Sequence, residues 1–166
     1  MSTSLLNPVL SPRQACGRAA FLGTAALAVA LTMQAQLGLE PCPLCILQRY
    51  CLLALIGLCL AGRFGPVGAT RWLGAAGTLA AVAGVGFALR HVYLQMFPPV
   101  VSVCGPGFEY IVDAFPLKDA LPMLFKGTGD CSKIDWEWGG LTLPRLSLIT
   151  FGALVFILTP PLLRRK

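Results

Sequence analysis

Residues 41–60 read PCPLCILQRYCLLALIGLCL, and this stretch joins a cysteine motif to a membrane helix. The motif Pro-Cys-Pro-Leu-Cys comes first, and an apolar run follows that supplies most of the roughly 20 residues needed to cross the bilayer core. Arg49 is the only charged residue in the stretch. The pattern therefore predicts a membrane-spanning helix that carries two cysteines at its mouth.

Three further apolar segments accompany this one. The chain is 56% hydrophobic and only 12% charged, about half of the ~25% that is typical of soluble domains. We therefore predict an all-α membrane protein in which one domain, residues 1–166, forms a four-transmembrane-helix bundle. The expected spans are about 19–39, 44–60, 72–89 and 143–163.

The distribution of charge predicts the orientation of the bundle. Four spans place both termini and the second connection on one side, and the connections at about 38–43 and 90–142 on the other. All seven acidic residues lie in the latter two connections. Basic residues occur on both sides, but those on the side of the termini are concentrated in short segments, which favours the cytoplasm for that side. This asymmetry accounts for the net charge of +6, so no nucleic-acid partner is expected.

The connection at about 90–142 is far longer than a structural link requires, and long loops commonly carry function. Leu117, Leu121 and Leu124 recur in it at helical spacing after Pro116. This pattern predicts a short amphipathic helix lying in the membrane interface, which Pro122 would kink.

Position along the spans sorts the seven cysteines into two classes. Three lie within spans or at the inner edge and are expected to be ordinary buried thiols: Cys16, Cys51 and Cys59. Four fall in the outer connections, where disulfides persist: Cys42, Cys45, Cys104 and Cys131. Four cysteines allow three pairings, and the simplest joins the first two and the last two.

The short spacing of Cys42 and Cys45 favours redox chemistry over stabilisation. A disulfide stabilises mainly through the loop that it closes, and this loop is too short to contribute much. The loop between Cys104 and Cys131 would contribute roughly 3 to 4 kcal/mol, so that pair can be structural, redox-active or both. The sulfurs of the first pair should lie over a helix N-terminus, which favours the thiolate.

Two more residues are candidates for this site. Arg49 lies one turn below Cys45, and an arginine at the centre of a span costs about 2.5 to 3.5 kcal/mol. It is expected to face an anion, either the Cys45 thiolate or the oxygen of a reduced quinone, although reaching to the lipid headgroups is the simpler alternative. His91 and Gln95, four residues apart where the third span emerges, could face the same pocket.

In their order, these motifs resemble the disulfide bond formation protein B (DsbB) family of bacterial inner-membrane thiol oxidoreductases. The resemblance covers most of the chain and rests on Pro41-Cys42-Pro43-Leu44-Cys45 with Gln48-Arg49, His91 with Leu94-Gln95 and Pro98, Cys104, Gly129-Asp130-Cys131, and Gly140-Leu141 with Pro144.

The resemblance implies that the protein reoxidises the periplasmic thiol oxidase DsbA and passes the electrons to ubiquinone or menaquinone. Cys104 would form the mixed disulfide with DsbA, Cys131 would attack the Cys42–Cys45 bond at Cys42, and Cys45 would face the quinone. Arg49 and His91 would belong to the quinone site, and no resident metal is expected. The resemblance also implies an inner-membrane protein with cytoplasmic termini and periplasmic catalytic cysteines.

Three other interpretations remain open at this stage. A quinone reductase resembling the vitamin K epoxide reductase family would also use such cysteines, but with the outer pair first in the sequence. A metal-binding membrane module would use the four outer cysteines as a tetrahedral zinc site. A passive structural subunit would show no dependence on quinone.

Overall fold

The computed structural model describes residues 11–39, 41–98, 116, 118, 129–134 and 136–163. Its long helices are α1 (Pro12–Leu37), α2 (Pro43–Phe64), α3 (Val67–Met96) and α6 (Leu143–Leu163). All four are long and apolar enough to cross a membrane, which confirms the predicted four-helix membrane fold. The interfacial helix expected over residues 117–124 lies almost entirely outside the described residues.

The first helix begins before its predicted span, because a capping box starts it. Ser11 is the N-cap: its hydroxyl accepts a hydrogen bond from the Gln14 backbone N–H, and the Gln14 side chain accepts one from the Ser11 N–H. Pro12 occupies the first turn, where its missing N–H costs nothing. The helix ends at Leu37, because Gly38 adopts a left-handed conformation with φ of 63°.

The connection between α2 and α3 is tight, so both helices are longer than the predicted spans. Only Gly65 and Pro66 separate Phe64 from Val67. The Thr70 hydroxyl donates a hydrogen bond to the Gly62 carbonyl at 3.0 Å, and the Arg13 guanidinium donates to the Gly65 carbonyl. The Thr70 bond joins α3 to α2, and the Arg13 bond ties the start of α1 to the turn at this end of the bundle.

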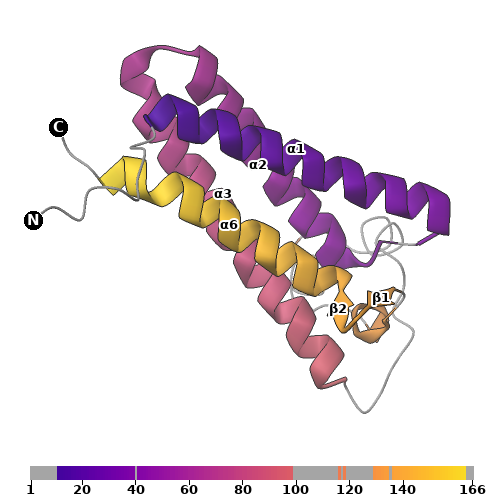
Figure 1. Cartoon of the computed structure of the whole chain (residues 1–166). Coiled ribbons are helices and arrows are strands. Elements are labelled where there is room, and N and C mark those ends of the chain that lie inside the picture. Colours follow the sequence, from indigo (N-terminus) through magenta and orange to yellow (C-terminus); the bar gives the residue numbers. More distant parts are fainter. Residues whose placement is uncertain are drawn as a thin grey trace, which may run out of the picture.

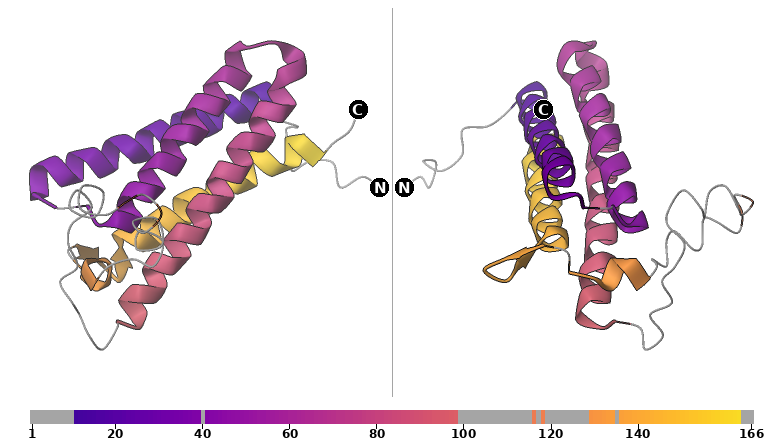
Figure 2. Two further views of the ribbon diagram at one scale, coloured as in Figure 1. Left: turned by 180° about the vertical axis from the view of Figure 1, so that it is seen from behind. Right: turned by 90° about the vertical axis from the view of Figure 1, so that its right-hand side faces the viewer.

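The four helices run alternately up and down, and each packs against two neighbours (Figures 1 and 2). Helix α2 lies between α1 and α3, and α6 closes the bundle between α3 and α1. Small residues allow close approach, as is common between membrane helices. At Gly84 of α3, an added Cβ would lie only 2.2 Å from the Phe151 ring of α6.

Short elements gather at the opposite end of the bundle from the α2–α3 turn (Figure 1). A 3₁₀ turn, η1 (Gly129–Ser132), packs on α3. It is followed by a hairpin of β1 (Glu137–Trp138) and β2 (Leu141–Thr142) that leads directly into α6. The two-residue turn of the hairpin is Gly139-Gly140, with φ of 56° and 83°. Both residues need positive φ in such a turn, so glycine is required there.

Candidate redox site

The two cysteines of the Cys-x-x-Cys motif lie at the start of α2, as the sequence predicts. Cys42 is the N-cap, and its sulfur accepts a hydrogen bond from the Cys45 backbone N–H at 3.4 Å. Pro43 occupies the first turn, so the two prolines that flank Cys42 restrict the backbone around the cap. The two sulfurs are 3.2 Å apart and are thiols in this structure. A small movement would bring them to the ~2.05 Å of a disulfide.

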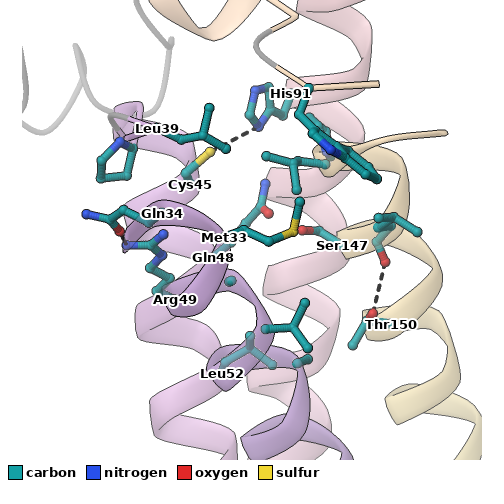
Figure 3. A pocket seen from close by; sticks show the side chains of 18 of the residues that line it. Met33, Gln34, Leu39, Cys45, Gln48, Arg49, Leu52, His91, Ser147 and Thr150 are labelled. Carbon is teal, nitrogen blue, oxygen red and sulfur yellow. Dashed lines mark hydrogen bonds between the residues drawn. The ribbon is translucent and has the colours of Figure 1, made fainter. Parts of the chain in front are cut away.

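His91 of α3 faces both sulfurs. Its Nε2 atom lies 3.7 Å from the Cys42 sulfur, and its Nδ1 atom lies 3.9 Å from the Cys45 sulfur. The ring is buried, with 4% of its surface exposed, and Figure 3 shows it pointing at Cys45 across the helix interface. A buried imidazole at this distance can exchange a proton with either thiol. His91, given only a secondary role by the sequence, is thus in direct contact with the cysteine pair.

Cys131 is brought to the same place by η1. Its side chain is fully buried in a small apolar cluster with Leu44 and Leu94, and its thiol is hydrogen-bonded to that of Cys42. A cysteine far away in the sequence therefore meets the N-terminal sulfur of the motif. This contact places the Cys131 sulfur beside that of Cys42.

Gln95, one turn beyond His91, connects the segments around Cys131 to α3. Its side-chain amide donates to the Lys133 carbonyl at 3.3 Å, and its side-chain oxygen accepts from the Thr142 hydroxyl at 2.9 Å. Because Thr142 is buried in β2, these bonds join the end of α3 both to the residues after η1 and to the hairpin. Gln95 is therefore a positioning residue for Cys131.

The pKa of the Cys42 thiol is raised well above its ordinary value. The largest cause is the hydrogen bond with Cys131, followed by the hydrogen bond with Cys45 and by burial. The direction is opposite to that expected for a sulfur at a helix N-terminus, because three neighbouring thiols cannot all ionise in a buried site. Cys42 therefore holds its proton in the reduced state.

A cavity of about 440 Å³ opens beside the cysteine pair, within the 300 to 1,000 Å³ usual for small-molecule sites. Its walls come from α1, α2, α3 and α6 and are mainly apolar, including Met33, Leu52 and Phe151. Cys42, Cys45 and His91 line it as well. The thiols therefore face a largely apolar chamber within the bundle.

Three of the polar residues that line this cavity come from α1 and α2. Arg49 donates a hydrogen bond from its Nη1 atom to the Gln34 side-chain oxygen at 2.6 Å, and the two side chains lie together in Figure 3. Gln48 is buried, and among the described residues its Nε2 atom has no hydrogen-bond partner. The cavity thus offers a cation held by Gln34 and an amide donor that has yet to be satisfied.

The structure brings most of the predicted site residues together: Cys42, Cys45, Cys131, Arg49 and His91. Cys104 lies outside the described residues. Sequence reasoning did not assign Gln34 or Gln48 to the site, although Gln48 precedes Arg49 in the quoted motif. A polar residue within an otherwise apolar span was the signal that could have found each of them.

A second pair of thiols lies elsewhere in the bundle. Cys16 of α1 and Cys59 of α2 are both buried and hydrogen-bonded to each other. They pack in the main apolar cluster, where Gly62 and Gly77 leave room for their sulfurs: a Cβ at those glycines would lie 3.3 Å and 3.1 Å from Cys16 and Cys59 Sγ, respectively. Neither cysteine lines the cavity.

The fold and this arrangement define a class: a four-helix membrane protein with a dithiol at the mouth of one helix and a third thiol in contact with it. The family model for "disulfide bond formation protein DsbB" matches residues 12–159. The chain therefore belongs to the DsbB family.

Curated relatives agree with this assignment, and each is named disulfide bond formation protein B. The protein from Azoarcus sp. is 49% identical over 132 residues, covering 78% of this chain and 79% of the relative. The protein from Aromatoleum aromaticum is 44% identical over 156 residues, covering 90% and 93%. The protein from Methylobacillus flagellatus is 47% identical over 144 residues, covering 82% and 87%. No solved structure matches the chain.

Proposed function

We propose that this protein acts in disulfide bond formation by reoxidising a DsbA-type periplasmic oxidase and passing two electrons to a membrane quinone. The contact that joins Cys131, Cys42, Cys45 and His91 is the observation that carries this proposal. It supplies a path along which electrons can move by thiol–disulfide exchange from a distant cysteine to the helix mouth.

The proposed sequence begins with the Cys104–Cys131 disulfide. Reduced DsbA opens it by forming a mixed disulfide with Cys104 and then leaves oxidised, so Cys104 and Cys131 become a dithiol. Cys131 next attacks the Cys42–Cys45 disulfide at Cys42 and releases Cys45 as the leaving thiolate. When Cys104 closes back on Cys131, Cys42 is released and accepts a proton, in keeping with its raised pKa. The two electrons now reside in the Cys42–Cys45 dithiol.

His91 and Arg49 serve the second half of the reaction. His91 contacts both sulfurs and can take up the proton that Cys42 loses as the disulfide forms again. Arg49, oriented by Gln34, supplies positive charge in the cavity, where negative charge develops on an acceptor. Gln48 has an unsatisfied donor for a carbonyl oxygen.

A quinone, which accepts two electrons and two protons, fits this cavity. The walls are mainly apolar, as a ring with an isoprenoid tail requires, and Arg49 and Gln48 offer hydrogen-bond donors, as its carbonyl oxygens require. The driving force also favours a quinone. DsbA is a strong oxidant at about −120 mV, and each ~30 mV uphill costs about 1.4 kcal/mol for two electrons. Few protein disulfides can therefore reoxidise DsbA.

The proposal includes an orientation in the bacterial inner membrane. The ends of α1 and α2 that carry Cys42 and Cys45 would face the periplasm, together with η1 and the hairpin. The α2–α3 turn and both termini would face the cytoplasm. The short basic segments at that side support this arrangement through the positive-inside rule.

The decisive experiment mixes purified protein with reduced DsbA and a soluble quinone and follows the quinone absorbance. We expect quinone reduction that requires both proteins. Absence of DsbA-dependent reduction would refute the proposal. Alkylation under non-reducing conditions, with a chelator present throughout purification, separates it from the zinc module: we expect four oxidised outer cysteines in the isolated protein, whereas four free thiols would exclude the disulfide relay.

A further inference from the structure

The reduced cysteine pair and His91 have the composition of a site for a thiophilic metal ion. Cys42, Cys45 and His91 each offer one ligand atom, and these three atoms lie within 4.8 Å of one another. Two thiolates and one imidazole are ligands that Zn²⁺ and related d¹⁰ ions prefer. The same placement of His91 against both sulfurs that suits proton exchange also suits coordination of an ion.

The separations match a tetrahedral ion after small adjustments. Metal–sulfur bonds of ~2.3 Å and metal–nitrogen bonds of ~2.05 Å place two sulfurs about 3.8 Å apart and a sulfur about 3.6 Å from a nitrogen. The sulfurs of Cys42 and Cys45 are 3.2 Å apart, and the Cys42 sulfur lies 3.7 Å from Nε2 of His91. The Cys45 sulfur lies 3.9 Å from the other ring nitrogen, Nδ1, so opening the cysteine pair by about half an ångström and turning the ring until one nitrogen faces both sulfurs would admit the ion.

The surroundings of these three ligands suit an ion. The buried Cys131 adds a further sulfur beside Cys42, to which its thiol is hydrogen-bonded. The cavity beside the pair gives an ion a route to the ligands, since Cys42, Cys45 and His91 all line it. The Arg49 guanidinium donates its hydrogen bond to Gln34, and Figure 3 shows these two side chains apart from His91.

We propose that the reduced form of this protein binds one Zn²⁺ or Cd²⁺ ion through Cys42, Cys45 and His91, and that the ion holds the enzyme in its reduced state. Each thiol loses a proton as its metal–sulfur bond forms, and no electron moves. The disulfide form has no thiolate to offer, so oxidation and metal binding exclude one another. The ion is an inhibitor of the reduced state and is distinct from a resident cofactor.

Binding of the metal and inhibition by it can be tested separately. Binding of the metal rests on the geometry of three side chains alone. Inhibition rests on the proposed function, because the ion would occupy the sulfurs that must form the disulfide again when a quinone is reduced. Quinone reduction with DsbA is therefore measured first with a chelator present, so that failure of the proposed function is seen without any metal.

The test of binding uses the full chain in detergent, reduced with a phosphine that is then removed, and Cd²⁺ as the probe. Equilibrium dialysis is expected to give one tightly bound Cd²⁺ per reduced chain and none at the same concentration for the oxidised chain. The oxidised chain keeps Cys16, Cys51 and Cys59 and therefore measures their background. Equal binding by the two forms would overturn the proposal.

A spectroscopic measurement can identify the ligands, because His91 is the only histidine in the chain. X-ray absorption of the Cd²⁺-loaded protein is expected to show imidazole scattering in addition to sulfur. His91→Gln should remove that signal and weaken binding at least about tenfold, while Cys16→Ala should change neither. A sulfur-only shell that His91→Gln leaves unaltered would place the ion on thiols alone and overturn the assignment.

Discussion

The two thiol pairs of this bundle have similar local chemistry and different surroundings. Cys42 and Cys45 lie at the mouth of α2, against His91 and Cys131, and line a cavity of about 440 Å³. Cys16 and Cys59 are also hydrogen-bonded to each other, but they are enclosed by apolar packing and glycine backbone. Under the proposed function, proximity of two thiols is therefore not enough to make a redox site.

In the part of the chain that the structure describes, the surroundings of Cys42 and Cys45, the outer pair, contain groups that the surroundings of Cys16 and Cys59, the inner pair, lack. A redox pair needs a donor thiol, a route for an acceptor and a group that exchanges protons. In the proposed function, and among the described residues, Cys131, the cavity and His91 would provide these at the outer pair. The inner pair has an apolar environment, in which a thiol behaves as a small hydrophobic side chain.

Removing one sulfur from each pair should give the largest contrast. Cys45→Ala is expected to abolish DsbA-dependent quinone reduction, because the disulfide that delivers electrons can no longer form. Cys59→Ala, on the same helix, is expected to retain most of the activity. Quinone absorbance in the coupled assay measures both variants. Loss of activity in both would mean that the inner pair takes part in electron transfer.

Neutralising a charge at each end of α2 should give the next largest effect. Arg49→Gln is expected to raise the KM for quinone by about tenfold to a hundredfold, since hydrogen bonds to charged groups contribute about 1.5 to 3 kcal/mol. Arg63→Gln is the matched control, because Arg63 is exposed at the other end of the helix. Steady-state kinetics with varied quinone would show the difference. Equal KM values for Arg49→Gln and the wild type would mean that Arg49 does not bind the quinone.

The free energy of unfolding should fall when volume is added to the packing that encloses the inner pair. Gly84 meets Phe151, a member of the same apolar cluster as Cys16 and Cys59, and an added Cβ would lie 2.2 Å from its ring. Gly84→Ala is expected to lower the free energy of unfolding by about 1 to 3 kcal/mol. Gly86→Ala, with nothing within 4 Å of the added Cβ, should be neutral or stabilising. Denaturation in detergent followed by circular dichroism measures both, and similar stabilities would contradict the close α3–α6 contact.

The smallest expected effect concerns the residue that orients Arg49. Gln34→Ala removes the 2.6 Å hydrogen bond to the guanidinium but leaves its charge. We expect the KM for quinone to rise about threefold to tenfold, less than for Arg49→Gln, with kcat nearly unchanged. Gln36→Ala, at an exposed position of the same helix, should have no effect. An unchanged KM in Gln34→Ala would mean that Arg49 is positioned without Gln34.

Much of the fold could be predicted because the bilayer imposes a simple requirement. A spanning segment must satisfy its own backbone hydrogen bonds and expose apolar side chains, so about 20 apolar residues indicate a helix. The helix ends were less predictable. The capping box of Ser11 and Gln14 and the turn at Gly65 and Pro66 extend helices beyond their apolar windows, because ends depend on local hydrogen bonds.

The residues of the proposed site could be singled out from the sequence, but most of their contacts could not. The spacing of Cys42 and Cys45 and the cost of burying Arg49 singled out these residues from sequence. The close approach of His91 to both sulfurs was not foreseen, and Arg49 lies against Gln34, a residue that sequence reasoning left out. These contacts cross between helices, and the rotation of each helix about its axis is set by packing.

The sequence by itself determined four membrane helices, a redox-type cysteine pair at the mouth of the second, and the separation of outer from inner cysteines. Only the tertiary structure decided that Cys131 meets Cys42, that His91 faces both sulfurs, and that Cys16 meets Cys59. The physical reason is that hydropathy and spacing act along one segment at a time. Contacts between side chains on different helices depend on how the whole bundle packs.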